Sequence, residues 1–166
     1  AQVMQTGSGV SHEEETVGDN TDFFQIWFDP NIRKTLQSEP TYSEHKNEDF
    51  PIESKDGVTL KTVIGDNSPV TLVSDVVMKD ISIESDRQFQ YRLSQEKTLA
   101  LVVISGKGLL FDMQTGSKHS VNKKDFALIH ARKYGNISMH ADSSALLRVA
   151  AIEVPAKVDY PLYRNQ

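Results

Sequence analysis

The sequence predicts an all-β fold, a sandwich or barrel built from short strands. From Thr59 onwards, β-branched and aromatic runs are separated by turn residues at regular intervals, as in sandwiches and barrels. Phe89, Tyr91 and Leu93 alternate with polar residues, which indicates a strand with one buried face. Residues 98–105 form the most apolar segment, so we expect this strand to lie centrally.

The expected strands follow one another along the chain. Residues 2–6 have the pattern of a strand end, and Gly7-Ser8-Gly9 is a turn in which missing Cβ atoms permit positive φ. Residues 10–14 are expected to form the next extended segment, residues 15–22 a polar loop, and Lys55-Asp56-Gly57 a further turn. The remaining segments that we expect to be extended are 23–28, 59–64, 70–78, 79–87, 88–93, 98–105, 109–113, 126–130, 137–140 and 145–152.

Residues 23–28 are aromatic and β-branched, which favours a strand. Both faces of that strand would be largely apolar, so we expect it to be buried on both sides. Gln25 would then lie inside, where it either contacts a ligand or satisfies a backbone group; the second role is the commoner one for a buried polar side chain.

The chain divides into three expected parts. Residues 1–50 comprise the opening segment and a linker, because 29–50 are polar and contain Pro30 and Pro40. Residues 51–154 hold the series of strands. Residues 155–166 form a tail that Tyr160, Leu162 and Tyr163 would pack onto the body or the first segment.

Composition excludes several classes of function. The 166 residues include no Cys, so there is no disulfide framework and no thiolate nucleophile or ligand. A net charge of −5 argues against a general nucleic-acid or anionic-membrane surface. No apolar stretch is long enough to span a bilayer, and no secretory signal opens the sequence. We therefore expect a cytoplasmic protein.

His12 and Glu14 are the candidate site residues. In a strand, residues i and i+2 share a face, so these two side chains would point the same way. An imidazole and a carboxylate form half of a typical mixed site for a divalent first-row metal. The alternative is a surface loop, in which Glu13, Glu14 and Glu15 are a solvated acidic run beside a solvated His.

The same opening residues resemble a known family. Residues 9–12, Gly-Val-Ser-His, have the Gly-x-x-His form of the second cupin motif, within a Gln-Val-Met-x-x-Gly-x-Gly-Val-Ser-His-x-Glu segment that is similar to the pirin family. Residues 23–30 match its hydrophobic-Gln-hydrophobic-Trp-hydrophobic-x-Pro strand, and Pro-x-Tyr at 40–42 and Gly-Asp-x-Ser-Pro-Val at 65–70 fit the same register. The order of these matches across residues 2–70 makes the resemblance more specific than any one match.

The resemblance implies a two-cupin protein of jelly-roll barrels. In that family the N-terminal cupin holds one iron-like metal with three His and one Glu, and some members resemble quercetin 2,3-dioxygenases in activity. Only His12 and Glu14 carry over as ligands, because the family's other pair, His-x-His, lies before the turn and this sequence starts at Ala1. We therefore expect one complete C-terminal barrel and a partial N-terminal cupin, either as part of a longer chain or as a shortened relative without the site.

The second half of the sequence resembles a complete cupin barrel without a metal. In a metal-binding cupin, the strand before the Gly106 turn would supply His-x-His and a carboxylate, but residues 89–97 contain no His. His119, His130 and His140 lie on different later strands or turns. A site made of these three is the less favoured interpretation, because a lone His at a strand end is usually a surface or hydrogen-bonded residue.

Two functions from different classes remain. In the first, the intact protein is a dioxygenase that uses a divalent metal, iron in the family pattern, on a flavonol-like aromatic substrate. His12 is then a neutral ligand, and Glu14 is a ligand that also accepts the substrate proton. This chain alone is expected to be inactive, and whether it binds a metal stays open. In the second, the protein is a non-enzymatic regulatory module that binds a protein partner, or dimerises, through the incomplete barrel.

Overall fold

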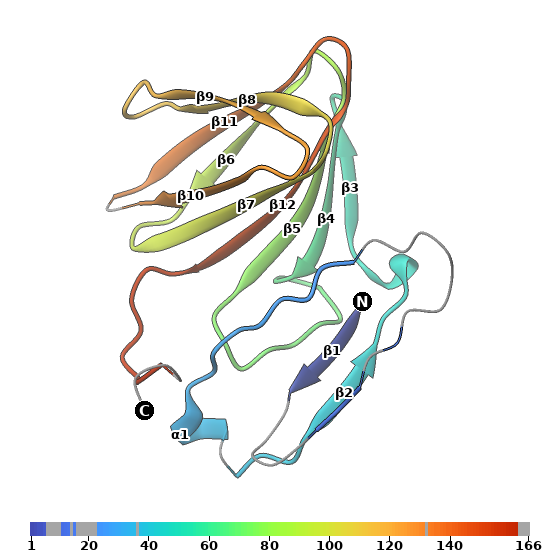
Figure 1. The fold of residues 1–166 in the computed structure, drawn as a ribbon, viewed down its shortest axis with the longest axis vertical. Coiled ribbons are helices and arrows are strands. Elements are labelled where there is room, and N and C mark those ends of the chain that lie inside the picture. Colours follow the sequence, from blue (N-terminus) through green and yellow to red (C-terminus); the bar gives the residue numbers. More distant parts are fainter. Residues whose placement is uncertain (6–10, 14, 16–22, 36, 132, 163–166) are drawn as a thin grey trace.

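A computed structural model describes residues 1–5, 11–13, 15, 23–35, 37–131 and 133–162 of the chain. Two antiparallel sheets face one another and form the body of the molecule (Figure 1). The larger sheet has the strand order β10-β7-β12-β5-β4-β3, and the smaller has the order β6-β11-β8-β9. The predicted all-β class is confirmed.

The bounds of the strands agree with most of the expected segments. The larger sheet contains β3 (Ile52–Lys55), β4 (Val58–Ile64), β5 (Val77–Ile83), β7 (Lys97–Ser105), β10 (Phe126–His130) and β12 (Leu147–Pro155). The smaller sheet contains β6 (Gln88–Leu93), β8 (Lys107–Asp112), β9 (Lys118–Asn122) and β11 (Gly135–Ala141). As predicted, the apolar segment 98–105 lies inside a sheet, with β7 between β10 and β12.

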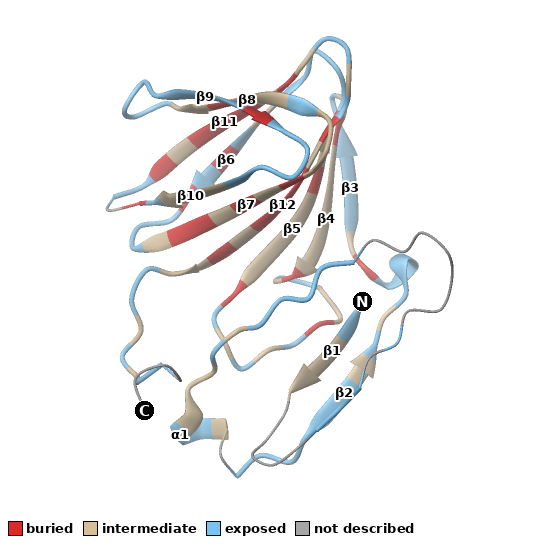
Figure 2. Cartoon of the chain, viewed as in Figure 1, coloured by how far each residue is buried: buried red, intermediate tan, exposed pale blue. Residues whose placement is uncertain are grey.

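The main core fills the space between the two sheets. Alternate residues of each strand point to one face, and from β4 to β12 most of those residues are apolar. Figure 2 shows the buried positions concentrated on β7, β11 and β12. The largest fully buried side chains are Ile81, Ile83, Leu93, Leu99, Leu101, Ile137, Met139, Leu147 and Val149.

The turn expected at residues 55–57 joins β3 to β4. Asp56 and Gly57 have φ values of 51° and 79°, and Lys55 lies opposite Val58 in the register. Two central residues with positive φ match the right-handed twist of the flanking strands, which is why Asp-Gly is favoured in such hairpins.

The opening segment packs on the outer face of the larger sheet. β1 (Gln2–Gln5) pairs with β2 (Thr41–Glu44), and two short helices, α1 (Ile32–Thr35) and η1 (Asn47–Asp49), lie in the same part of the chain. A second apolar cluster joins this segment to the sheet. Its buried members are Phe50, Ile64, Val70 and Val76, and Val3, Phe28, Met78, Ile152 and Val154 are among the partly buried residues around them. β2 lies within the stretch that was expected to be a linker.

The predicted buried strand at residues 23–28 is wrong. The structure assigns no helix or strand there, and Phe23, Phe24 and Trp27 expose 62%, 54% and 82% of their surface. Gln25 is exposed as well, whereas Phe28 packs against the second cluster. A strand needs a neighbour to satisfy its backbone groups, and no described strand pairs with this segment.

The extended run expected at residues 70–78 is also shorter than predicted, because β5 begins only at Val77. Val70 and Val76 are buried in the second cluster without belonging to a strand. The tail contacts both the first segment and the body. The Tyr160 hydroxyl donates to the carbonyl oxygen of Asp29 at 3.3 Å, and the Ala156 N–H donates to the carbonyl oxygen of Glu96 at 2.8 Å. Tyr163 lies outside the described residues.

Candidate functional site

The opening segment does not present a complete candidate site in the described part of the chain. Ser11, His12 and Glu13 are exposed and belong to no helix or strand. Glu14 lies outside the described residues, so the shared face expected for His12 and Glu14 remains a prediction. The surface-loop alternative fits the exposure of His12 and Glu13.

The described donors do not make a metal site of the kind that the cupin resemblance implies. No group of three or more His, Cys, Asp or Glu side chains gathers anywhere in the described ranges. Two protein ligands leave most positions of a first-row metal to water, which gives low affinity. These residues therefore do not fit such a metal by themselves.

The three later histidines lie apart in the fold. His130 belongs to β10 of the larger sheet, and its Nδ1 is 2.8 Å from the Thr98 hydroxyl. His140 is on β11, with its Nε2 2.9 Å from the Ser138 hydroxyl. His119 lies opposite Leu110 on β8 whereas His140 lies opposite Leu109, so their side chains point to opposite faces of the smaller sheet.

The barrel interior carries one polar pair that the sequence analysis did not identify. Glu153 on β12 follows Leu147, Val149 and Ala151 at alternate positions, all of which face the core. Its Oε2 accepts a hydrogen bond of 3.1 Å from the hydroxyl of Tyr91 across the barrel. The sequence feature that could have revealed the pair is Glu153 itself, a carboxylate at an inward-facing position of a strongly apolar strand.

Burial sets the protonation of the Tyr91 phenol. Tyr91 is 5% exposed and Glu153 is 9% exposed. Burial raises the pKa of Tyr91 above its usual range, and the negative charge of Glu153 and the hydrogen bond to it raise that pKa further. The phenol therefore stays protonated and serves as a fixed donor to the carboxylate, in an interior that is otherwise packed with apolar side chains.

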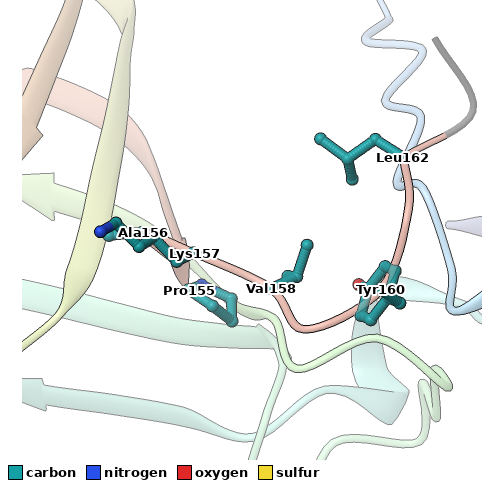
Figure 3. Close-up of a pocket in the computed structure, with 6 residues that line it drawn as sticks. All are labelled: Pro155, Ala156, Lys157, Val158, Tyr160 and Leu162. Carbon is teal, nitrogen blue, oxygen red and sulfur yellow. The ribbon is translucent and has the colours of Figure 1, made fainter. Parts of the chain in front are cut away.

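A shallow hollow lies at the tail (Figure 3). It has a volume of about 410 Å³ and is lined by Pro155, Ala156, Lys157, Val158, Tyr160 and Leu162. Lys157 is the only ionisable group in this lining besides the Tyr160 phenol, whose hydroxyl is bonded to Asp29. The hollow therefore offers no pair of groups for acid–base chemistry.

Comparison with known proteins identifies the fold. No family model matches the chain, and no curated protein matches its sequence. Quercetin 2,3-dioxygenase from Acinetobacter baumannii matches in structure with a TM-score of 0.62 and 16% identity, over 77% of this chain and 43% of that one. GK1651 from Geobacillus kaustophilus matches with a TM-score of 0.61 and 19% identity, over 77% and 51%. The polyketide cyclase RemF from Streptomyces resistomycificus matches with a TM-score of 0.53 and 12% identity, over 69% and 80%.

At these identities the likeness establishes the fold alone. The chain has the jelly-roll barrel of the cupin fold, so the predicted fold class is confirmed. It spans roughly half the length of the first two structures. None of the described helices is long and apolar enough to cross a membrane.

Proposed function

We propose that this chain belongs to a pirin-like two-cupin protein that acts as a metal-dependent dioxygenase on flavonol-like substrates. The observation that carries the proposal is the ordered run of motifs in residues 2–70 on a chain whose later strands form a cupin barrel. The structural likeness to a quercetin 2,3-dioxygenase supports the choice of reaction class. In this proposal residues 1–50 belong to the N-terminal cupin and linker, 51–154 are the C-terminal cupin, and 155–166 are the tail.

His12 and Glu14 are the residues of this chain that would hold the metal, which we propose to be iron. Both come from the opening segment, and the apolar barrel acts as a scaffold. Glu14 would also accept the substrate proton. Because two ligands do not suffice, the remaining ligands come from elsewhere in the whole gene product, and the chain alone has no turnover.

Elemental analysis of the purified whole gene product and of this chain tests the proposal. The whole product is expected to carry close to one equivalent of metal and to consume quercetin with dioxygen uptake. His12→Ala and Glu14→Gln should each lower the metal content and the turnover together. His119→Ala is the matched control, since His119 is an exposed histidine on β9. A metal-free whole product would refute the proposal.

A second candidate, a non-enzymatic module that binds a protein partner, is favoured by the exposed aromatic segment. Phe23, Phe24 and Trp27 present large apolar surfaces side by side along the chain, and exposed apolar patches often mark interaction sites. β1 pairs only with β2 among the described strands, so it also offers a strand edge. Light scattering with native mass spectrometry separates the two candidates: a metal-free product that forms a defined dimer or hetero-complex supports the module, and a metal-loaded product with turnover supports the enzyme.

A further inference from the structure

A groove of about 410 Å³ lies on the outer face of the larger sheet. Arg148 lines this groove. It alternates along β12 with the core residues Leu147 and Val149, so it faces away from the barrel interior. The groove spans β3, β4, β5, β12 and the end of β7, and η1 contributes at one side. Its lining residues are Asn47, Ile52, Thr59, Lys61, Asp80, Ser82, Ser105, Leu146 and Arg148.

The strand register places a row of hydroxyl groups around Arg148. Thr59 lies opposite Ser82, Ser82 lies opposite Arg148, and Arg148 lies opposite Ser105. Directly opposed residues on neighbouring strands have side chains within reach of one another. Arg148 therefore has a serine opposite it on the neighbouring strand at either side.

Asp80 fixes the orientation of Arg148. Its Oδ1 accepts a hydrogen bond of 2.9 Å from Nε, and its Oδ2 accepts one of 2.6 Å from Nη2. These bonds raise the pKa of Arg148, so the guanidinium is always charged. They use two of its five N–H groups, and the Arg148 side chain remains 43% exposed. Three N–H groups are thus left to face a ligand from a preorganised position.

Donors exceed acceptors in the rest of the groove. The Lys61 ammonium donates to Asn47 Oδ1 at 2.7 Å and lies 4.0 Å from Asp80 Oδ2, so both acceptors are already engaged. The partly buried Ser82 and Ser105 also line the groove, and their hydroxyls add donors to it. Two cations and one carboxylate leave a net charge of +1 among the lining side chains.

We propose that this groove binds a small organic anion through a carboxylate or phosphate group. Arg148, Ser82 and Ser105 would donate to the anionic oxygens, and the surplus charge of Lys61 would favour them. The exposed side chains of Ile52 and Leu146, at 50% and 43% exposure, flank these donors and would contact an apolar body of the ligand. The site lies outside the barrel and does not depend on the metal site proposed above.

Titration of the ¹⁵N-labelled 166-residue chain with benzoate, phenyl phosphate and inorganic phosphate tests the proposal by NMR. Saturable shifts of the Ser82, Ser105 and Arg148 amides are expected with at least one of the two organic anions, and the anion that saturates them identifies the group recognised. Inorganic phosphate should bind more weakly, because it lacks an apolar body. No saturable shift at these amides with either organic anion would overturn the proposal. Equal affinity for inorganic phosphate would overturn the contact with Ile52 and Leu146.

Three variants locate the site. Ser82→Asp places a negative charge beside Arg148 and should weaken binding of the effective anion about tenfold or more. Ser120→Asp, at an exposed serine of β9, makes the same change of net charge in the other sheet and should leave the affinity within about twofold. Lys61→Gln, which removes the surplus charge, provides a second weakened variant should Ser82→Asp fail to show the native circular dichroism spectrum. Undiminished binding in a folded Ser82→Asp or Lys61→Gln protein would contradict the assignment.

Discussion

At the scale of single residues, the Tyr91 hydroxyl is the donor on which a buried carboxylate depends. Glu153 sits among core side chains and accepts the Tyr91 hydrogen bond at 3.1 Å. A buried carboxylate that loses its partner carries the full cost of its desolvation. The pair therefore explains how a charged residue is tolerated in an otherwise apolar barrel.

Tyr91→Phe should lower the free energy of unfolding by about 1–3 kcal/mol, because it removes only the donor and leaves Glu153 buried. Glu153→Gln should lower the free energy of unfolding by a smaller amount, because the amide oxygen still accepts the hydrogen bond from Tyr91 and no charge is buried. Urea unfolding of the three proteins at neutral pH measures both changes. A Tyr91→Phe protein as stable as the wild type would show that the hydrogen bond contributes nothing.

The raised pKa of Tyr91 predicts that the folded protein loses stability in alkali. The pKa of Tyr91 is raised in the folded protein, so the native state retains a proton that the unfolded chain releases near its ordinary pKa of about 10. The stabilisation is complete below that pH and is lost as the pH rises through and beyond it. The unfolding free energy of the wild type should therefore fall more steeply than that of Tyr91→Phe between about pH 9 and pH 11. Parallel pH profiles for the two proteins would exclude this linkage.

At the scale of elements, two turns require glycine for different reasons. One requires it only for its backbone conformation, and the other also because a side chain would clash with a neighbouring segment. Gly106, between β7 and β8, has a φ of 79°, and an added Cβ would lie 1.7 Å from the carbonyl oxygen of Leu146. Gly116, between β8 and β9, has a similar φ of 74° with no atom within 4 Å of such a Cβ. The first turn therefore requires glycine for both reasons, and the second only for its conformation.

Gly116→Ala should destabilise the protein by about 1–2 kcal/mol, the usual cost of the left-handed conformation for a residue with a Cβ. Gly106→Ala should cost clearly more, about 3 kcal/mol or above, because the Leu146 backbone must also move. Thermal and urea unfolding of the two variants measure the difference. Equal losses would mean that the close approach to Leu146 is easily relieved.

Sequence patterns correctly predicted the hairpin whose two strands are neighbours in the sequence, and the strands in which apolar and polar residues alternate regularly. Phe89, Tyr91 and Leu93 gave the correct face of β6, and Asp56-Gly57 gave the hairpin turn. Residues 23–28 carried an equally strong apolar pattern and were mispredicted, since composition shows which residues favour burial but does not show which strand pairs with them. The Tyr91–Glu153 contact was missed for a related reason: its two residues are 62 positions apart and meet only through the curvature of the barrel.

At the scale of the whole molecule, the opening segment is anchored on the outer sheet face but leaves its aromatic residues in solvent. Phe28 packs into the second cluster, whereas Trp27 beside it is 82% exposed. In the binding module proposed above, Phe23, Phe24 and Trp27 would form the docking surface.

Trp27 reports on that surface directly, because it is the one tryptophan of the sequence. Its fluorescence in the isolated chain should resemble that of tryptophan in water and should be readily quenched by iodide. Binding of a partner or a second cupin to this segment should shift the emission to shorter wavelength and protect it from iodide. A blue-shifted, protected emission in the monomeric isolated chain would show that the segment is buried after all.

We propose the metal site in the opening segment and not in the barrel, whose interior is lined by apolar side chains around the Tyr91–Glu153 pair. Addition of Mn²⁺ to the ¹⁵N-labelled chain tests it, because the paramagnetic ion broadens the amide signals of residues around it. The interior amides of Tyr91, Leu101 and Met139 are expected to keep their intensity at one equivalent of metal. Stoichiometric broadening of those three signals would place a metal inside the barrel and contradict this assignment.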